Sequence, residues 1–298
     1  MMRSAPGLLA QAITQGVVAC ADVLGGAVTL VPCSRSNLVH RLEVDGVVVA
    51  YVKQQGQATA TDGLETAARE AAVLRGLLGA PVPRLLHADD DAVWTAPIPG
   101  IPLHDALPHD PVPVARALGT TLAALHRHPR PVGAVPEATR PWPITGEAPA
   151  SVLSAPDGTL AADLAARVLE GSTEEACTVR RAGRQWRRSH WIHGDLSAAN
   201  VLVTGRGQTA TTRLIDLEDG GLGDPSWDVV CALRVMDDCL SLADDEAARH
   251  GFLDAYAAGS GPGMDHPGLR LAHDLMSDTR SALSDLVSWG RVQQVLAS

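Results

Sequence analysis

The densest group of polar side chains that could carry out chemistry lies within residues 191–218. His193 and Asp195 flank a glycine, Asn200 follows five residues after Asp195, and Asp216 comes after a second apolar run. Carboxylate and amide oxygens suit Mg²⁺, which in proteins binds through a few such oxygens together with phosphate groups. A carboxylate beside that metal can orient an acceptor hydroxyl and take its proton. These residue types in this order therefore indicate a magnesium site that handles phosphate groups.

Short apolar runs around these side chains predict the strands that would position them. Residues 200–204 read as a strand that follows the loop after Asp195, and Asp216 stands at the end of the next strand. Residues opposite each other on paired strands lie roughly 5 Å apart. Pairing of these two strands is therefore expected to bring Asn200 and Asp216 together.

A single lysine is the second candidate. Lys53 is the one lysine among 24 basic residues, and the others are arginines. A compact ammonium and a planar guanidinium are not interchangeable, so we interpret Lys53 as a position that arginine does not fill. An Asp-Gly pair is a hairpin signal, and the run 47–53 that follows it predicts a strand. Because strand side chains alternate, Tyr51 and Val49 are expected to share the face of Lys53.

A predicted helix over residues 62–79 offers two glutamates as partners for Lys53. Asp62 and Glu65 have the spacing of a capping box, so Glu65 is explained as a helix-capping residue. Glu70 falls among the apolar positions of the helix, where an unpaired carboxylate is costly. We therefore choose Glu70 as the expected partner.

The rest of the chain predicts a small β-rich lobe, a hinge and a larger helical lobe. Further strands are predicted at 27–32, 38–44, 84–88 and 92–96. Helices are predicted at 113–127, 159–170 and 174–188, and from about 226 to the end. Two prolines and a glycine at 97–100 interrupt the chain between the two parts. We expect an α+β fold with two lobes, residues 1–97 and residues 98–298.

Taken together, the motifs resemble a known family. HGD followed after four residues by Asn, with LIDLEDGGLGDPSWDVV downstream, resembles the aminoglycoside phosphotransferase and choline kinase group. A helical segment at 118–126 is similar to a recurrent helix of that group, and the resemblance covers nearly the whole chain. It implies a protein-kinase-like bilobal fold and a kinase that uses ATP and Mg²⁺, with GTP left open as the donor.

The resemblance implies a role for each residue around the catalytic loop. Asp195 corresponds to the base or hydroxyl-orienting residue, and Asn200 and Asp216 correspond to Mg²⁺ ligands. Asp228 resembles a structural residue that braces the loop. His193 is expected to brace the loop as well, with a direct chemical role as the alternative. Leu and Glu follow Asp216 where protein kinases have Phe and Gly, so we expect no switch of that type.

The resemblance also implies a nucleotide site in the small lobe. Lys53 fits the position that contacts phosphates and pairs with a helix glutamate, here Glu70. No glycine-rich loop is present between the first two strands, so Ser34 and Ser36 are expected to contact phosphate, with a simple serine turn as the alternative. Tyr51 is expected to stack on adenine, or else to be a core aromatic residue. The predicted nucleotide-binding residues are Ser34, Ser36, Val49, Tyr51 and Lys53.

The resemblance places the acceptor site in the helical lobe, facing Asp195. Residues 237–285 contain ten acids against three arginines, which leaves a local charge of −7. The acids are Asp237, Asp238, Asp244, Asp245, Glu246, Asp254, Asp265, Asp274, Asp278 and Asp285, and the arginines are Arg249, Arg270 and Arg280. An acidic cleft would bind a polycationic acceptor, and the alternative is an ordinary solvated helical surface.

A basic cluster before the catalytic loop points the other way. Its members are Arg180, Arg181, Arg184, Arg187 and Arg188. We expect them to pair with Glu174 and Glu175 on a helix face. The alternative is that they hold an anionic acceptor or an acidic leader peptide.

Composition bounds the partners and the compartment. The net charge of −10 argues against a nucleic-acid partner. Five scattered cysteines fit a reducing cytoplasm. The chain has no uninterrupted apolar stretch of about 18 residues, so no membrane-spanning helix is predicted. Together with the family resemblance, these limits lead us to predict a cytoplasmic kinase that phosphorylates a hydroxyl of a small natural product, in particular a cationic antibiotic or its precursor. The alternatives are a Ser/Thr kinase acting on a ribosomally made peptide, a primary-metabolite kinase and an inactive nucleotide-binding scaffold. The oligomeric state is left open.

Overall fold

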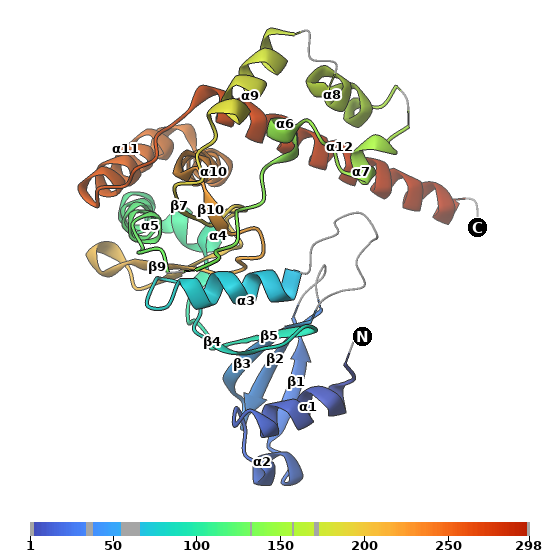
Figure 1. The fold of residues 1–298 in the computed structure, drawn as a ribbon, viewed down its shortest axis with the longest axis vertical. Coiled ribbons are helices and arrows are strands. Elements are labelled where there is room, and N and C mark those ends of the chain that lie inside the picture. The colour runs from blue at the N-terminus through green and yellow to red at the C-terminus, as the bar shows by residue number, and fades with distance from the viewer. Residues whose placement is uncertain are drawn as a thin grey trace.

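A computed structural model describes the backbone of most of the chain. The described residues are 3–33, 38–54, 66–131, 133–156, 158–169 and 173–296. They form a small lobe built on an antiparallel sheet and a larger, mainly helical lobe, with α3 (Thr66–Gly76) between them in Figure 1. This arrangement confirms the predicted α+β, protein-kinase-like bilobal fold.

A five-stranded antiparallel sheet in the order β1-β2-β3-β5-β4 forms the small lobe. Its strands are β1 (Val28–Pro32), β2 (Leu38–Val44), β3 (Val47–Gln54), β4 (Leu85–Ala88) and β5 (Ala92–Thr95). In the turn between β2 and β3, Asp45 and Gly46 have φ values of 50° and 77°. These are the left-handed values that a type I′ hairpin turn requires. The five strand predictions are confirmed to within one residue at each end.

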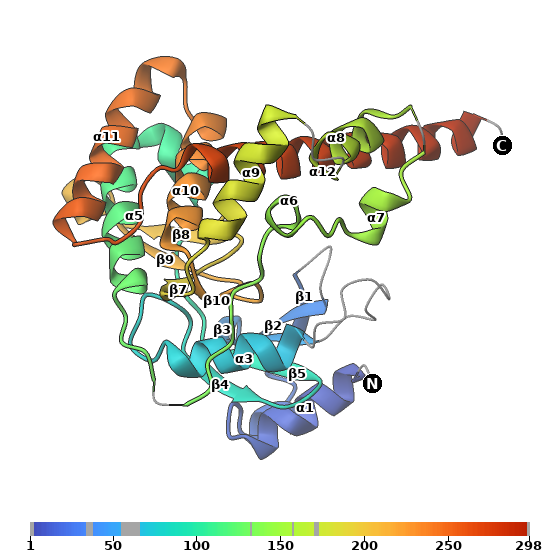
Figure 2. The same cartoon turned by 45° about the horizontal axis from the view of Figure 1, so that its top comes forward.

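Two N-terminal helices, α1 (Ala5–Thr14) and α2 (Cys20–Leu24), were not predicted from the sequence. Figures 1 and 2 show α1 against the face of the sheet that lies away from α3. Leu8 and Ala12 of α1 pack there with Trp94 and other sheet residues in a core of their own. The helix therefore covers apolar side chains that would otherwise face water.

The chain crosses to the larger lobe through residues 96–100 and strand β6 (Ile101–Pro102). Two residues of this linker are prolines, which have a restricted φ and no backbone N–H. Gly100 has a φ of 142°, and a Cβ atom on it would lie 2.9 Å from the Val203 carbonyl oxygen. Glycine alone allows this close approach. The predicted domain boundary between residues 97 and 98 falls in this linker and stays a prediction.

Helices make up most of the larger lobe. They are α4 (Leu103–Ala106), α5 (Pro111–His126), α6 (Trp142–Thr145), α7 (Ala150–Leu153), α8 (Leu160–Leu169), α9 (Glu174–Gln185), α10 (Pro225–Cys239), α11 (Leu242–Ala258) and α12 (Pro267–Leu296). Two 3₁₀ turns span Leu107–His109 and Gly207–Thr209. The strands are β7 (His190–Ile192), β8 (Val201–Thr204), β9 (Thr211–Leu214) and β10 (Gly221–Gly223). They form two small sheets, β10-β7 and β6-β8-β9.

The predicted helices are present, and their ends differ by a few residues. The helix predicted over 62–79 is observed as α3, and its predicted start at Asp62 and Glu65 lies outside the described residues. The run predicted from 226 onward is three helices, α10, α11 and α12. In the part of the chain that the structure describes, no helix has the length and apolar character that a membrane crossing requires.

Packing of α5 against α11 organises the core of the larger lobe. Leu118 and Leu122 of α5 are buried in the same cluster as Phe252 and Tyr256 of α11. A Cβ atom on Gly119 would lie 2.3 Å from the Phe252 carbonyl oxygen. The glycine of the recurrent helical segment is therefore needed for the close approach of these two helices.

Pairing of β8 with β9 brings two candidate metal ligands together. Val201 lies opposite Leu214, and the Ile215 N–H donates to the Asn200 carbonyl oxygen at 2.9 Å. Asn200 directly precedes β8 and Asp216 comes shortly after β9, so both lie at the same end of this ladder, as the strand pattern predicted.

Candidate active site

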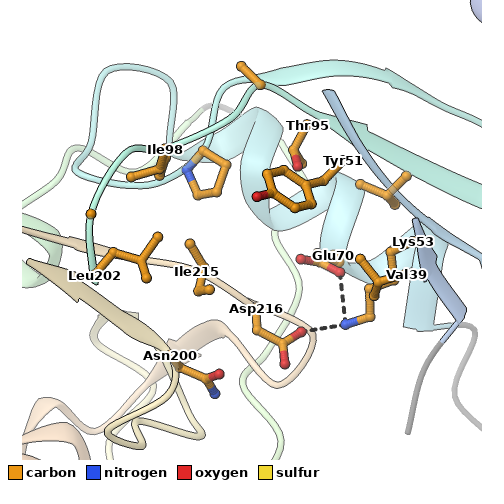
Figure 3. A pocket seen from close by; sticks show the side chains of 14 residues that line it. Val39, Tyr51, Lys53, Glu70, Thr95, Ile98, Asn200, Leu202, Ile215 and Asp216 are labelled. Atoms are coloured by element: carbon orange, nitrogen blue, oxygen red, sulfur yellow. Dashed lines mark hydrogen bonds and ion pairs between the residues drawn. The ribbon is translucent and has the colours of Figure 1, made fainter. Parts of the chain in front are cut away.

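A pocket of about 340 Å³ lies between the two lobes. Figure 3 shows residues that line it from the sheet, the linker and the β8–β9 sheet. Among them are Val39, Tyr51, Lys53, Glu70, Thr95, Ile98, Asn200, Leu202, Ile215 and Asp216. Pockets for ligands of drug or cofactor size have volumes of about 300–1,000 Å³ and mostly apolar walls with a few polar groups. This pocket has both properties.

Lys53 is the cation of this pocket and contacts three carboxylates. Its Nζ atom lies 3.3 Å from Glu70 Oε2 and 2.7 Å from Glu218 Oε2, and it donates a hydrogen bond to Asp216 Oδ1. Figure 3 shows the contacts with Glu70 and Asp216. Burial lowers the pKa of Lys53, but the three carboxylates outweigh burial and raise it above its usual range. Lys53 is therefore an ammonium ion placed between the two lobes.

Glu70 is held inside the protein by α3. Only 7% of its side chain is exposed, and its Oε1 atom accepts a hydrogen bond of 3.3 Å from the Leu217 N–H. Burial raises the pKa of Glu70, and Lys53 opposes that shift. The structure thus brings Glu70 to Lys53, as the apolar pattern of the helix predicted.

Glu218 is a site residue that the sequence pattern did not predict, since it stood out only as a departure from the protein-kinase triplet. The signal in the sequence is a second carboxylate two positions after Asp216. Its contact with Lys53 adds a third carboxylate to the site.

Asp216 has an unusual backbone conformation. Its φ of 63° lies in the left-handed region, which few residues other than glycine adopt. Such a conformation costs on the order of 1–3 kcal/mol and is concentrated at functional sites. Here it accompanies a carboxylate that contacts Lys53 across the pocket.

The loop between β7 and β8, residues 193–200, carries both Asp195 and Asn200. The Asn200 Nδ2 atom donates to the Asp195 carbonyl oxygen at 3.0 Å, so the amide oxygen of Asn200 remains for another ligand. Asp216 uses Oδ1 for Lys53, and its second oxygen also remains. An amide oxygen and a carboxylate oxygen at one edge of a pocket are hard donors that fit Mg²⁺, which takes its other ligands from phosphate and water.

Asp228, in the first turn of α10, holds this loop in place through hydrogen bonds to its backbone. Its carboxylate accepts hydrogen bonds from the backbone N–H groups of His193 at 2.7 Å and Gly194 at 3.1 Å. It also contacts His126 Nε2 at 3.0 Å. Burial favours the neutral acid, but the hydrogen bond and charge of His126 and the contacts with His193 outweigh it and lower the pKa of Asp228.

His193 has the contacts of a bracing residue. It is fully buried, its Nε2 atom lies 2.8 Å from the Ile215 carbonyl oxygen, and its Nδ1 atom accepts from the Asp195 N–H at 3.3 Å. Next to it, Gly194 has a φ of 87°, and a Cβ atom there would lie 2.5 Å from the Asp219 carbonyl oxygen. The loop therefore requires glycine between His193 and Asp195.

Residues 29–269 match the profile of one protein family, described as the phosphotransferase enzyme family. The chain belongs to this family. No match to the sequence was found among curated proteins.

Solved structures share the fold of this phosphotransferase. A macrolide 2′-phosphotransferase from Brachybacterium faecium is 22% identical, with 95% of this chain and 92% of that chain covered and a TM-score of 0.55. A choline kinase from Streptococcus pneumoniae is 14% identical, with 93% and 91% covered and a TM-score of 0.59. An aminoglycoside phosphotransferase from Streptomyces rimosus, in complex with ADP and streptomycin, is 18% identical, with 90% and 98% covered and a TM-score of 0.57.

Two of the five predicted nucleotide-binding residues of the phosphotransferase line the pocket. Tyr51 and Lys53 line the pocket, whereas Val49 does not and packs instead against the smaller core beside α1. The reason is an irregularity in the ladder, because Leu42 pairs with Ala50 and Glu43 with Val48, so Val49 is skipped. The alternation from Lys53 fails at this bulge, and the prediction that Val49 lines the cleft is corrected. Ser34 and Ser36 lie outside the described residues.

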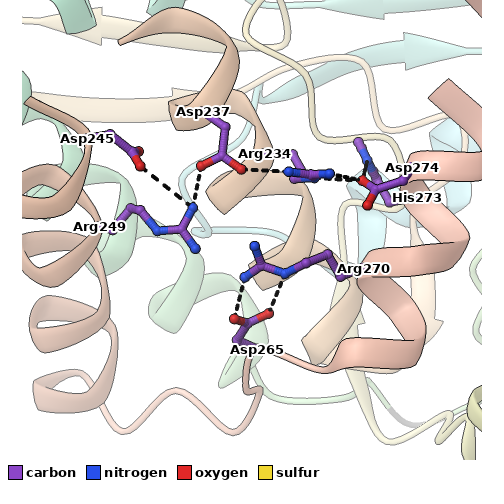
Figure 4. Close-up of polar contacts among 8 residues, drawn as sticks. All are labelled: Arg234, Asp237, Asp245, Arg249, Asp265, Arg270, His273 and Asp274. Atoms are coloured by element: carbon purple, nitrogen blue, oxygen red, sulfur yellow. Dashed lines mark hydrogen bonds and ion pairs between the residues drawn. The ribbon is translucent and has the colours of Figure 1, made fainter. Parts of the chain in front are cut away.

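Within the described residues, four of the ten acids in the acidic stretch of the phosphotransferase pair with arginines. Figure 4 shows Asp237 between Arg234 and Arg249, and Arg234 in turn contacting Asp274 of α12. Asp265 pairs with Arg270. Arg234 lies just outside the stretch whose charge was counted from the sequence. The excess of negative charge is therefore smaller in the folded protein than the count from the sequence suggests.

The basic cluster is also partly paired, though not with the expected partners. Arg187 contacts Asp224 at 3.5 Å, and Arg188 contacts Glu137 at 2.5 Å. Glu175 pairs with Arg167 of α8. These contacts connect α9 and the segment after it to neighbouring parts of the lobe, which is a structural role.

We expect Asp228→Asn to lower the free energy of unfolding by about 1–3 kcal/mol at neutral pH. The substitution replaces a buried carboxylate, which accepts charge-assisted hydrogen bonds, by a neutral amide that accepts weaker ones. The folded pKa of Asp228 is depressed, so its contribution is present above the unfolded pKa of about 3.9 and is lost as pH falls through the folded pKa. Urea denaturation of both proteins between pH 3 and pH 7 should therefore show a difference that shrinks below about pH 4.

The matched control is Asp254→Asn, which changes an exposed carboxylate on α11. It should change the free energy of unfolding by no more than about 0.5 kcal/mol. An Asp228→Asn protein as stable as the wild type at pH 7 would contradict the bracing role.

Proposed function

We propose that this phosphotransferase moves the γ-phosphoryl group of ATP to a hydroxyl of a small natural product, with Mg²⁺ as the metal. The observation that carries the proposal is Lys53, which is held by Glu70 and Asp216 at the pocket between the lobes. An ammonium between two lobes, opposite hard oxygen donors, is an arrangement that suits a nucleotide phosphate chain.

Each residue then has one task in the transfer. Lys53 contacts phosphate oxygens, and Glu70 holds its ammonium in place. Asn200 and Asp216 hold Mg²⁺, which would neutralise charge on the phosphates when bound. Asp195 orients the acceptor hydroxyl and takes its proton as the new O–P bond forms. The bond between the γ-phosphorus and the oxygen that bridges it to the β-phosphate breaks, and ADP leaves with that oxygen. Tyr51 offers its ring to the adenine base, and Ser34 and Ser36 are proposed as phosphate contacts.

The similar structures support the choice of a small acceptor. They include a macrolide 2′-phosphotransferase, a choline kinase, and an aminoglycoside phosphotransferase in complex with ADP and streptomycin. We propose a role in antibiotic inactivation or biosynthesis in the cytoplasm. No contact among the described residues favours the peptide kinase or the inactive scaffold over this proposal.

The direct test is transfer of label from γ-labelled ATP into a panel of antibiotics, sugars, hydroxyamino acids and peptides, followed by mass spectrometry of the products. The expected result is one phosphorylated hydroxyl compound, with loss of transfer when Mg²⁺ is chelated. ATP consumption without any labelled acceptor in the panel, or label that appears on the protein alone, would contradict the proposal.

We expect Asp216→Ala to raise the Mg²⁺ concentration for half-maximal activity at least about tenfold. Loss of a residue that only hydrogen-bonds to a metal ligand already costs about 10–100-fold in metal affinity, and Asp216 is proposed as a ligand itself. Asn200→Ala should raise it by a smaller factor, because an amide brings a carbonyl oxygen without charge. Magnesium titrations of turnover at saturating ATP measure both. Unchanged titration curves in the two variants would show that neither residue binds the metal.

A further inference from the structure

A second hollow adjoins the loop that carries Asp195, and it shares no lining residue with the pocket between the lobes. Its volume is about 170 Å³, and Asp195 lines it together with residues of α10 and α12. Leu196, Trp227, Val235 and Met276 provide apolar wall. Pockets for drug-sized ligands begin at about 300 Å³, so this hollow suits a compact molecule whose hydroxyl reaches Asp195.

Two of the basic side chains around this hollow, Arg234 and His273, offer no free positive charge to a ligand. Arg234 is occupied, with Asp237 at 2.9 Å and Asp274 at 2.6 Å from its guanidinium nitrogens, as Figure 4 shows. Burial lowers the pKa of His273, which favours the neutral ring at physiological pH. The ring lies 5.8 Å from that of Trp227, centroid to centroid.

Two charged side chains at the hollow remain available. Asp238 and Arg280 both line it, both are exposed, and within the described residues neither has an ion-pair partner. Both are close enough to His273 to influence its ionisation, Asp238 in one direction and Arg280 in the other. One carboxylate and one guanidinium therefore stand beside the same small hollow as Asp195.

We propose that the acceptor is a compact zwitterion, with an amino group for Asp238 and an acidic group for Arg280, and with the hydroxyl that receives phosphate at Asp195. Hydroxyamino acids belong to this chemical class. The inference rests on the proposed function and specifies its substrate. It replaces the polycationic acceptor expected from the sequence.

Charge explains why other acceptors fit less well. A polycation would meet Arg280 and would find Asp237 and Asp274 already paired. An acid without an amino group would have no positive charge to offset the repulsion between its own negative charge and the carboxylates of Asp238 and Asp195. A zwitterion leaves no like charges facing each other, and specificity of this kind depends on such repulsion as much as on attraction.

A matched set of probes tests the proposal. L-serine, ethanolamine and 3-hydroxypropanoate all have a hydroxyl group. L-serine carries a positive and a negative charge, ethanolamine only the positive one and 3-hydroxypropanoate only the negative one. L-homoserine, 3-aminopropanol and 4-hydroxybutanoate repeat the comparison with one more carbon. For at least one chain length, kcat/KM for the zwitterion should exceed that for each singly charged analogue by about fivefold or more, as contacts between exposed charges are worth up to about 1 kcal/mol.

Two variants assign the charges. Arg280→Gln should reduce the preference for the zwitterion over its amine-only analogue, and Asp238→Asn should reduce the preference over the acid-only analogue, each by about fivefold. Arg75→Gln is the control, because Arg75 is an exposed arginine on α3 and the preferences should persist in it.

The outcomes separate this inference from the proposed function. Phosphorylation of ethanolamine, 3-aminopropanol or kanamycin at least as fast as that of the zwitterions would overturn the inference and leave the proposed function standing. Preferences that survive in both variants would overturn it as well. If no compound is phosphorylated the inference fails, and calorimetry with Mg·ATP on the wild type and Lys53→Met then decides whether the proposed nucleotide site fails with it.

Discussion

Asp195→Ala should abolish phosphoryl transfer while ATP binding persists. Loss of a group that orients the acceptor and takes its proton typically costs at least about 10²-fold in rate. Asp195 lines the hollow on the acceptor side and is absent from the residues that line the nucleotide pocket, so its removal leaves Lys53 and Asp216 in place. Single-turnover transfer and calorimetric titration with Mg·ATP measure the two effects separately.

The control for Asp195→Ala is again Asp254→Asn, which changes a carboxylate on the surface of the same lobe. Circular dichroism should show that both variants are folded. Near-normal turnover of Asp195→Ala at saturating substrates would remove Asp195 from the reaction. Loss of ATP binding in this variant would mean that the two sites are not separated as described.

Removal of the Lys53 ammonium should have the next largest effect. Lys53→Met would leave Glu70, Asp216 and Glu218 without the cation that they share. The phosphates would also lose the ammonium that contacts them in the proposed site, and loss of one such preorganised donor costs about 10²–10³-fold in rate, so we expect kcat/KM for ATP to fall about 10²-fold or more. Lys53→Arg should still cost at least about tenfold, because a planar guanidinium presents its donors in a fixed fork and is larger.

A double-mutant cycle tests whether Lys53 and Glu70 act together. Glu70→Ala should produce a smaller loss than Lys53→Arg, and the effects should be less than additive because the two side chains are in contact. The measurement is kcat/KM for ATP in the two single variants and the double variant. Simple additivity, or wild-type behaviour of Lys53→Arg, would place the nucleotide site elsewhere.

Local sequence determined the catalytic loop and most of the secondary structure. The spacing from Asp195 to Asn200 and the two short strands that follow are properties of one contiguous segment. Such a segment has few ways to pair, so the sequence was enough to predict that Asn200 and Asp216 meet. The apolar pattern of α3 likewise identified Glu70, because a carboxylate on the buried face of a helix needs a partner.

Three features were decided only by tertiary structure. Val49 faces away from the pocket because a bulge interrupts the ladder between β2 and β3, and the alternation rule does not contain bulges. Glu218 reaches Lys53 from 165 positions further along the chain only because the lobes meet there. Asp237 and Asp274 of the acidic stretch pair with Arg234, which contacts Asp237 within α10 and Asp274 across the packing of α10 with α12. A count along the chain adds charges that are close in sequence, whereas ion pairs form between charges that are close in space.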